Sequence, residues 1–197
     1  MKKIALGFGI LTVLFYSCEK IEDIESTQAT QDHLFAEQSF NDVGRIVEEG
    51  FLSSGINKSY PSYQLMNADT TNADTLIINF GTTNWLHNTK LRKGKLIITY
   101  TAKYRDSLAV MTTTFDNYYV NNNLIQGERI VTNQGRNNKG KMWFTIEVNN
   151  ARIGTINWNA NRTREWVSGN ATYYDISDDQ YKITGSANGT GVNNNSF

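Results

Sequence analysis

The chain has 197 residues, a length that suits one domain with or without a tail and is sufficient to bury a hydrophobic core. Lysine plus arginine and aspartate plus glutamate both number 19, so the net charge is zero and the basic surface of a nucleic-acid-binding protein is not expected. The only histidines are His33 and His87, which disfavours most metal sites and most histidine-based catalysis.

Residues 1–17 have the pattern of a lipoprotein signal peptide. Lys2 and Lys3 precede an apolar run, residues 4–15, that is shorter than the roughly 20 residues of a membrane-spanning helix. Ser17 and Cys18 then resemble a bacterial lipobox. This resemblance implies cleavage before Cys18, the single cysteine, and attachment of fatty acyl chains such as palmitate. A cleaved secretory signal with an incidental cysteine is the alternative.

Residues 18–30 follow as an acidic tether. The stretch "CEKIEDIE" resembles the signal that directs some Bacteroidota lipoproteins to the outer face of the outer membrane. The resemblance implies a cell-envelope location, as an outer-membrane lipoprotein that is periplasmic or surface-exposed. The membrane is then a partner through the lipid anchor.

Residues 31–51 are predicted to form an amphipathic helix. Its apolar stripe consists of Phe40, Val43, Val47 and Phe51, with Ile46 beside them. Asp32 is placed to cap the start and Gly50 to mark the end, whereas Gly44 argues against an unbroken helix. His33 is interpreted as a solvated side chain. Residues 52–74 are polar and are predicted to be a loop.

Residues 75–197 are predicted to form an antiparallel β-domain, because the period of the apolar residues changes to two. In "KLIITYTAKY", Leu96, Ile98 and Tyr100 face one side while Lys95 and Ile97 face the other, and "KMWFTIEV" repeats this alternation. Short Asn- and Asp-rich joints between strands exclude parallel crossovers. The expected fold class is therefore mainly β, an antiparallel meander sheet, open, twisted or sandwich-like, preceded by one helix.

Several strand segments together resemble an uncharacterised family of β-rich Bacteroidota lipoproteins. They are "INFGTTN", "RKGKLIITYTAKYRD", "TTTFDNYYVNNNLIQGERIVTN", "NRTREWVSG" and "DDQYKITGSANGTG". The resemblance spans roughly residues 30–197 and implies a β-rich envelope lipoprotein without indicating a chemistry. Members typically continue past the G-T-G step, so this chain is expected to be short at its carboxyl end, leaving the last strand as an exposed edge.

Short Asp-Thr and Asp-Ser motifs suggest O-glycosylation at Thr70, Thr75 and Ser107, because each resembles the sequon that Bacteroidota glycosylate. Ordinary turn chemistry at strand ends is the alternative. A cluster of acids at Asp175, Asp178 and Asp179 lacks the spacing of a calcium loop and is interpreted as a solvated turn. No metal and no cofactor are predicted.

Three tryptophans, Trp143, Trp158 and Trp166, are candidates for a platform that stacks sugar rings, although cross-strand aromatic pairs that stabilise a sheet are the commoner arrangement. Arg162 and Arg164 lie two apart on a strand and hence on one face. They would clamp an anion or, by the simpler interpretation, pair with carboxylates of neighbouring strands, Glu128 or Glu147.

No catalytic motif is found, and the chain is not predicted to be an enzyme. The leading hypothesis is a lipid-anchored binding or structural module of the cell envelope, with a glycan or an envelope protein as its partner. One alternative is a surface glycan hydrolase that uses a carboxylate pair drawn from Glu128, Glu147 and Glu165. A second is a lipid carrier that shelters an acyl chain on the apolar face of Leu96 and Ile98.

Overall fold

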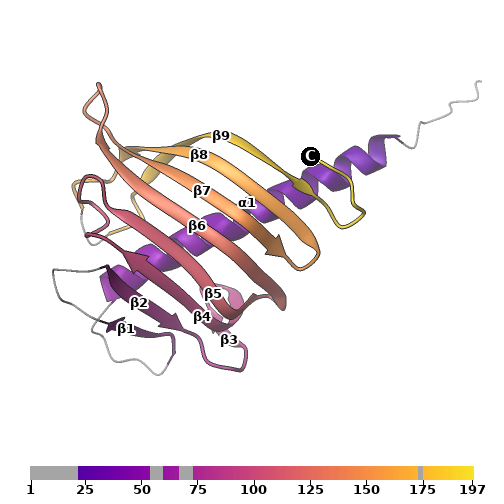
Figure 1. The fold of residues 1–197 in the computed structure, drawn as a ribbon, viewed down its shortest axis with the longest axis horizontal. Coiled ribbons are helices and arrows are strands. Elements are labelled where there is room, and N and C mark those ends of the chain that lie inside the picture. The colour runs from indigo at the N-terminus through magenta and orange to yellow at the C-terminus, as the bar shows by residue number, and fades with distance from the viewer. Residues whose placement is uncertain (1–21, 54–59, 67–72, 173–174) are drawn as a thin grey trace, which may run out of the picture.

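The computed structural model describes residues 22–53, 60–66, 73–172 and 175–197. Over these ranges the chain forms one open antiparallel sheet, with a long helix, α1 (Glu22–Ser53), lying diagonally across one face (Figure 1). The strands are β1 (Ser62–Met66), β2 (Asp74–Asn79), β3 (Trp85–His87), β4 (Lys90–Tyr100), β5 (Val110–Val120), β6 (Asn123–Arg136), β7 (Met142–Ile153), β8 (Ile156–Ser168) and β9 (Gln180–Thr190). They follow one another in chain order except that β3 pairs only with β4. The expected fold class is confirmed.

The helix is longer than the apolar stripe predicts, since 31–51 is expected whereas α1 begins at Glu22 and ends at Ser53. Asp32 lies within the helix and does not cap it. Its carboxylate instead accepts hydrogen bonds from the backbone N–H of Val192 at 2.8 Å and from the Gln28 side chain at 2.9 Å. The segment expected as a loop, 52–74, also contains the strand β1.

Two glycines within α1 let the helix approach the sheet closely. A Cβ at Gly50 would lie 2.5 Å from Cδ1 of Ile78, and one at Gly44 would lie 2.7 Å from Nη2 of Arg129. A Cβ at either position would therefore require the end of the Ile78 or Arg129 side chain to shift. Gly44 therefore does not break the helix, and its missing side chain leaves room for a buried arginine of β6.

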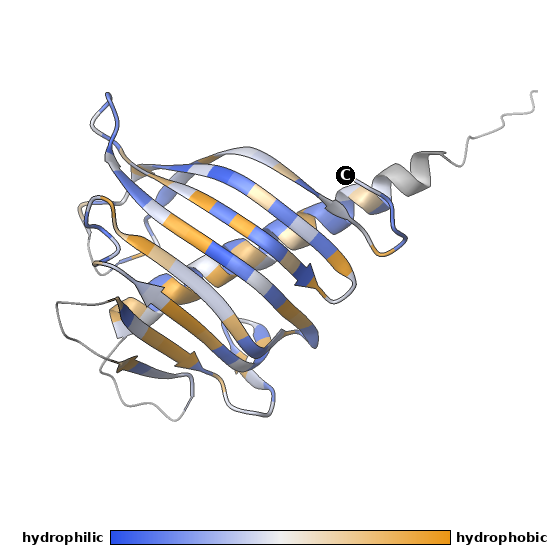
Figure 2. Ribbon diagram, in the orientation of Figure 1, coloured by the Kyte–Doolittle hydropathy of each residue, from blue (hydrophilic) through white to orange (hydrophobic). Residues whose placement is uncertain are grey.

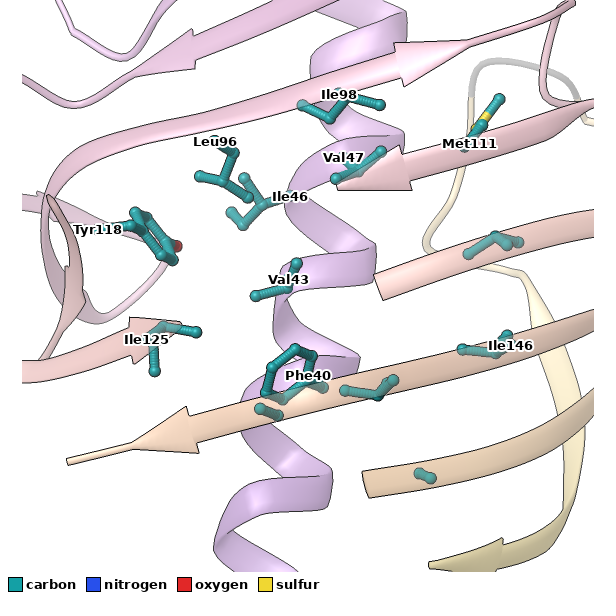
Figure 3. Close-up of a cluster of buried hydrophobic side chains, with 14 of the residues drawn as sticks. Phe40, Val43, Ile46, Val47, Leu96, Ile98, Met111, Tyr118, Ile125 and Ile146 are labelled. Carbon is teal, nitrogen blue, oxygen red and sulfur yellow. The ribbon is translucent and has the colours of Figure 1, made fainter. Parts of the chain in front are cut away.

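The hydrophobic core lies between α1 and the sheet face that it covers, which we call the inner face; the opposite side is the outer face. Apolar and polar residues alternate along the strands (Figure 2). The predicted stripe is confirmed, because Phe40, Val43, Ile46 and Val47 are buried and point toward the strands (Figure 3). The predicted inward side chain Leu96 is also buried.

Ion pairs join α1 to the inner face. Arg92 of β4 is fully buried and donates to both carboxylate oxygens of Asp42, at 2.7 and 3.0 Å, and to the Tyr118 hydroxyl at 2.8 Å. Burial alone would raise the pKa of Asp42, but the hydrogen bond and charge of Arg92, together with the hydrogen bond from Arg45 and the charge of Lys90, outweigh burial and lower it. The pair is thus formed in its charged state inside the core.

The two arginines of β8 face the helix as well. Arg162 forms a bidentate pair with Glu37, and Nη1 of Arg164 lies 2.8 Å from Oε1 of Glu48. The expected cross-strand pairing with Glu128 or Glu147 is wrong. Because both guanidinium groups lie on the inner face, the helix supplies their carboxylates.

The carboxyl-terminal segment folds back on the end of β9. Gly189 and Phe197 exchange two backbone hydrogen bonds, of 3.1 and 3.2 Å, so this end of the expected edge is covered. The Phe197 ring lies 5.2 Å from the ring of His33, whose Nδ1 accepts a hydrogen bond from Nε1 of Trp158 at 3.3 Å. His33 is therefore a hydrogen-bonded side chain of intermediate exposure that packs on neighbouring rings, and it is less solvated than the sequence suggested.

Candidate functional site

The three candidate tryptophans do not share a surface. Trp158 is 2% exposed and packs 5.4 Å from the Phe40 ring, and Trp166 is 1% exposed with its Nε1 donating to Asp179. Both belong to the inner face, while Trp143 lies on the outer face opposite Glu165. The three indoles therefore do not form the expected stacking platform, because two of them are buried in the core.

The candidate modification sites differ in accessibility. Cys18 and Thr70 lie outside the described residues. Thr75 is partly buried within β2, between Met66 and Thr99. Ser107 is exposed in the turn between β4 and β5. Of the two described hydroxyls, Ser107 is the one open to a glycosyltransferase.

The three aspartates of the acidic cluster bind different partners. Asp175 accepts from Ser177, Asp178 accepts from Thr172, and Asp179 accepts from Trp166 and Tyr181. Within the described residues, no group of three or more His, Cys, Asp and Glu side chains is arranged to hold a metal ion.

The candidate carboxylates of a hydrolase lie on the outer face. Glu147 is exposed, and its register partner on β6 is Ile130, which lies two residues from Glu128 in sequence. Glu165 lies on the next strand, where its carboxylate accepts a hydrogen bond of 2.6 Å from Asn137. An enclosed site is not formed around Glu147, which lies on the open surface of the sheet.

The apolar face proposed for a lipid carrier is occupied by α1. Leu96 and Ile98 are fully buried, and the ring of Tyr100 packs edge-on against Phe51 of the helix at 5.0 Å. An acyl chain would have to displace the helix to reach this surface. Within the described residues, no helix has the length and apolarity needed to cross a membrane.

A groove of about 520 Å³ crosses the outer face over β2, β4 and β5, and we call it the outer-face groove. Its floor is formed by a bulge at Gly94, where the pairing register with β5 shifts. Gly94 has a φ of +84°, and a Cβ there would lie 2.0 Å from the carbonyl oxygen of Asn117. Only glycine permits this close backbone approach, which hollows the sheet surface.

Aromatic rings line the groove. Tyr60 is 43% exposed, and its ring lies over Gly81 and 6.0 Å from the ring of Trp85, which is also 43% exposed. Across the groove, the ammonium group of Lys93 lies 4.3 Å from the centroid of the Tyr119 ring. These side chains combine apolar ring surfaces with polar tips that reach water.

Polar side chains complete the lining. Lys95 and Asp116 form an ion pair of 3.1 Å, and Asp116 also accepts a hydrogen bond from Asn117 at 3.0 Å. Asn79 lines the groove from β2. Ammonium, amide and carboxylate groups together offer both donors and acceptors to a ligand.

Sequence reasoning did not identify this groove. The usable signal is "RKGK", residues 92–95, where a glycine between two lysines interrupts the period-two pattern at the start of a strand. Tyr60 could not be assigned to the groove from sequence, because it precedes β1 in a segment that was predicted to be a loop.

Comparison of the chain with family models, with curated proteins and with solved structures gives no significant match. The candidate site is therefore argued from its own geometry.

Proposed function

We propose that the chain is a lipid-anchored, non-enzymatic binding module of the cell envelope that binds a saccharide in its outer-face groove. The observation that carries this proposal is the composition of the groove, in which the rings of Tyr60 and Tyr119 accompany amide, ammonium and carboxylate groups. Sugar rings present apolar C–H faces and a rim of hydroxyls, and this lining matches both features.

The charge of the groove narrows the ligand class. Lys93 and Lys95 contribute two positive charges, and Asp116 contributes one negative charge. A surplus of one positive charge favours a neutral or acidic saccharide over a basic one.

The position of the groove is compatible with a lipid anchor at Cys18. The C-terminal part of α1 packs on β2 through Gly50, while Asp32, closer to the helix start, contacts the segment that follows β9. The groove is lined by residues of β2, β4 and β5. Strands β2 and β4 lie toward the C-terminal end of α1 (Figure 1). An anchor preceding the helix would leave the groove on the side of the domain farther from the membrane.

Replacing Tyr60 or Tyr119 by alanine is expected to weaken retention on a glycan array by roughly two- to tenfold, because each substitution removes a ring contact worth about 0.5–1.5 kcal/mol. Trp143→Ala is the matched control, since it removes an outer-face aromatic residue of β7 that does not line the groove. Equal retention by all three variants, or no retention of the unaltered protein, would contradict a saccharide site in the groove.

Cys18→Ser is expected to abolish the incorporation of radiolabelled palmitate and to move the protein from the membrane fraction to the soluble fraction. A serine hydroxyl does not replace the thiolate in thioether formation. Ser17→Ala keeps a small residue before the cysteine and should retain the label. Label in the Cys18→Ser variant would exclude this anchor.

A further inference from the structure

A second hollow lies on the other side of the sheet, between α1 and strands β6, β8 and β9. It has a volume of about 280 Å³, and we call it the helix–sheet cleft. The lining residues that matter here are Arg45, Glu48, Arg129, Arg164, Asp179 and Ile183. It is separated from the outer-face groove by the sheet itself.

Arg164 lines this cleft, and two of its polar atoms have no hydrogen-bond partner among the described residues. The residue is 7% exposed, and Nη1 is engaged by Glu48 at 2.8 Å. Its Nε and Nη2 atoms are buried and have no hydrogen-bond acceptor within the described part of the chain. A buried N–H group without an acceptor is costly, so the edge that these two atoms form favours a ligand that supplies one.

The neighbouring arginine shows what this edge binds. Arg162 uses the same pair of atoms, Nε and Nη2, to hold the two carboxylate oxygens of Glu37. The two N–H bonds of this edge point in parallel and match the spacing of a carboxylate. Arg164, two residues along β8, presents an equivalent edge that no described protein carboxylate occupies.

Arg129 adds a second buried cation. It is 5% exposed beneath Gly44, and burial lowers its pKa to about 10, with the charge of Glu48 offsetting only part of the effect. An anion in the cleft would stabilise the charged form of this side chain.

The two carboxylates that line the cleft already accept hydrogen bonds. Glu48 accepts from Arg164 and from the Tyr104 hydroxyl at 3.0 Å, and Asp179 accepts from Trp166 and Tyr181 at 3.1 Å each. Of the three arginines in the lining, Arg45 is paired with Asp42 at 3.0 Å, which leaves Arg129 and Arg164 beside Glu48 and Asp179. The groups left for a ligand are therefore donors.

We propose that the helix–sheet cleft binds a small organic carboxylate, whose two oxygens accept hydrogen bonds from Nε and Nη2 of Arg164 while Arg129 supplies a second positive charge. The apolar body of the ligand contacts Ile183, a 41%-exposed side chain at the mouth of the cleft. This site is independent of the saccharide groove.

Titration of the full chain with benzoate, followed by calorimetry, tests the proposal. Saturable binding with one site is expected, and Arg164→Gln should weaken it at least tenfold. Arg162→Gln is the matched control on the same strand and should leave benzoate affinity within about twofold, because its edge is held by Glu37. Absence of saturable binding to the unaltered protein, or equal weakening by both variants, would overturn the proposal.

Two further measurements keep the result interpretable. Ile183→Trp fills the mouth of the cleft from an exposed position and should abolish benzoate binding. This variant tests the site independently if circular dichroism shows that Arg164→Gln does not fold. Inorganic phosphate serves as a tetrahedral probe of the same arginines. Arg164-dependent binding of phosphate without binding of benzoate would overturn the assignment to carboxylates.

Discussion

Asp42→Ala is expected to lower the free energy of unfolding by about 3–5 kcal/mol, because it leaves the guanidinium of Arg92 charged and without a carboxylate inside the core. Arg92 is fully buried, and Asp42 accepts two of its hydrogen bonds. The remaining hydrogen-bond partners of Arg92 are neutral: the Tyr118 hydroxyl and the carbonyl oxygen of His87. Urea denaturation followed by circular dichroism measures the loss.

The exposed ion pair of Lys95 and Asp116 provides a matched control. Both side chains are 43% exposed, so water already solvates each charge. Asp116→Ala should therefore change the free energy of unfolding by no more than about 1 kcal/mol. Similar losses in the two variants would show that burial does not govern the strength of the Asp42 pair.

Acidification should reveal the same pair in the unaltered protein. The pKa of Asp42 is lower in the folded state than its ordinary value of 3.8, so its contribution is complete above that value and disappears as the pH falls through the folded pKa. The free energy of unfolding should thus decline below about pH 4 more steeply in the unaltered protein than in Asp42→Asn. Parallel pH profiles would contradict this assignment.

Features that depend on local periodicity could be predicted from the sequence. The alternation around Leu96 identified both faces of β4, and the spacing of Phe40, Val43 and Val47 identified the buried side of α1. Short polar joints allowed only an antiparallel order of strands. In each case the signal lies within about ten consecutive residues.

Features that depend on distant contacts could not be predicted. Arg162 pairs with Glu37, which is 125 residues away in sequence. Because sequence reasoning cannot detect such a distant partner, it predicted carboxylates on the adjacent strands instead. The extra turns of α1, residues 22–30, contain few apolar residues, and Asp32, which follows them, is held by the backbone of Val192. The outer-face groove depends on a bulge at Gly94, whose effect on the surface is set by β5.

The second large effect is expected for Phe40→Ala, which should lower the free energy of unfolding by about 3–5 kcal/mol. Phe40 is 2% exposed and points from α1 toward the strands (Figure 3). Its ring meets Phe115 edge-on at 6.0 Å and Trp158 at 5.4 Å, joining α1 to β5 and β8. The open sheet has one layer, and α1 covers its inner face. A cavity at Phe40 therefore weakens the contact that buries that face.

Phe35→Ala separates burial from helix propensity in this experiment. Phe35 lies on the same helix and is 41% exposed, and both substitutions replace phenylalanine by a better helix former. We expect Phe35→Ala to change the free energy of unfolding by less than about 1 kcal/mol. If the two variants lost equal stability in urea, the assignment of the loss to buried packing at Phe40 would be contradicted. A loss confined to Phe40→Ala would establish that the sheet depends on the helix for its core.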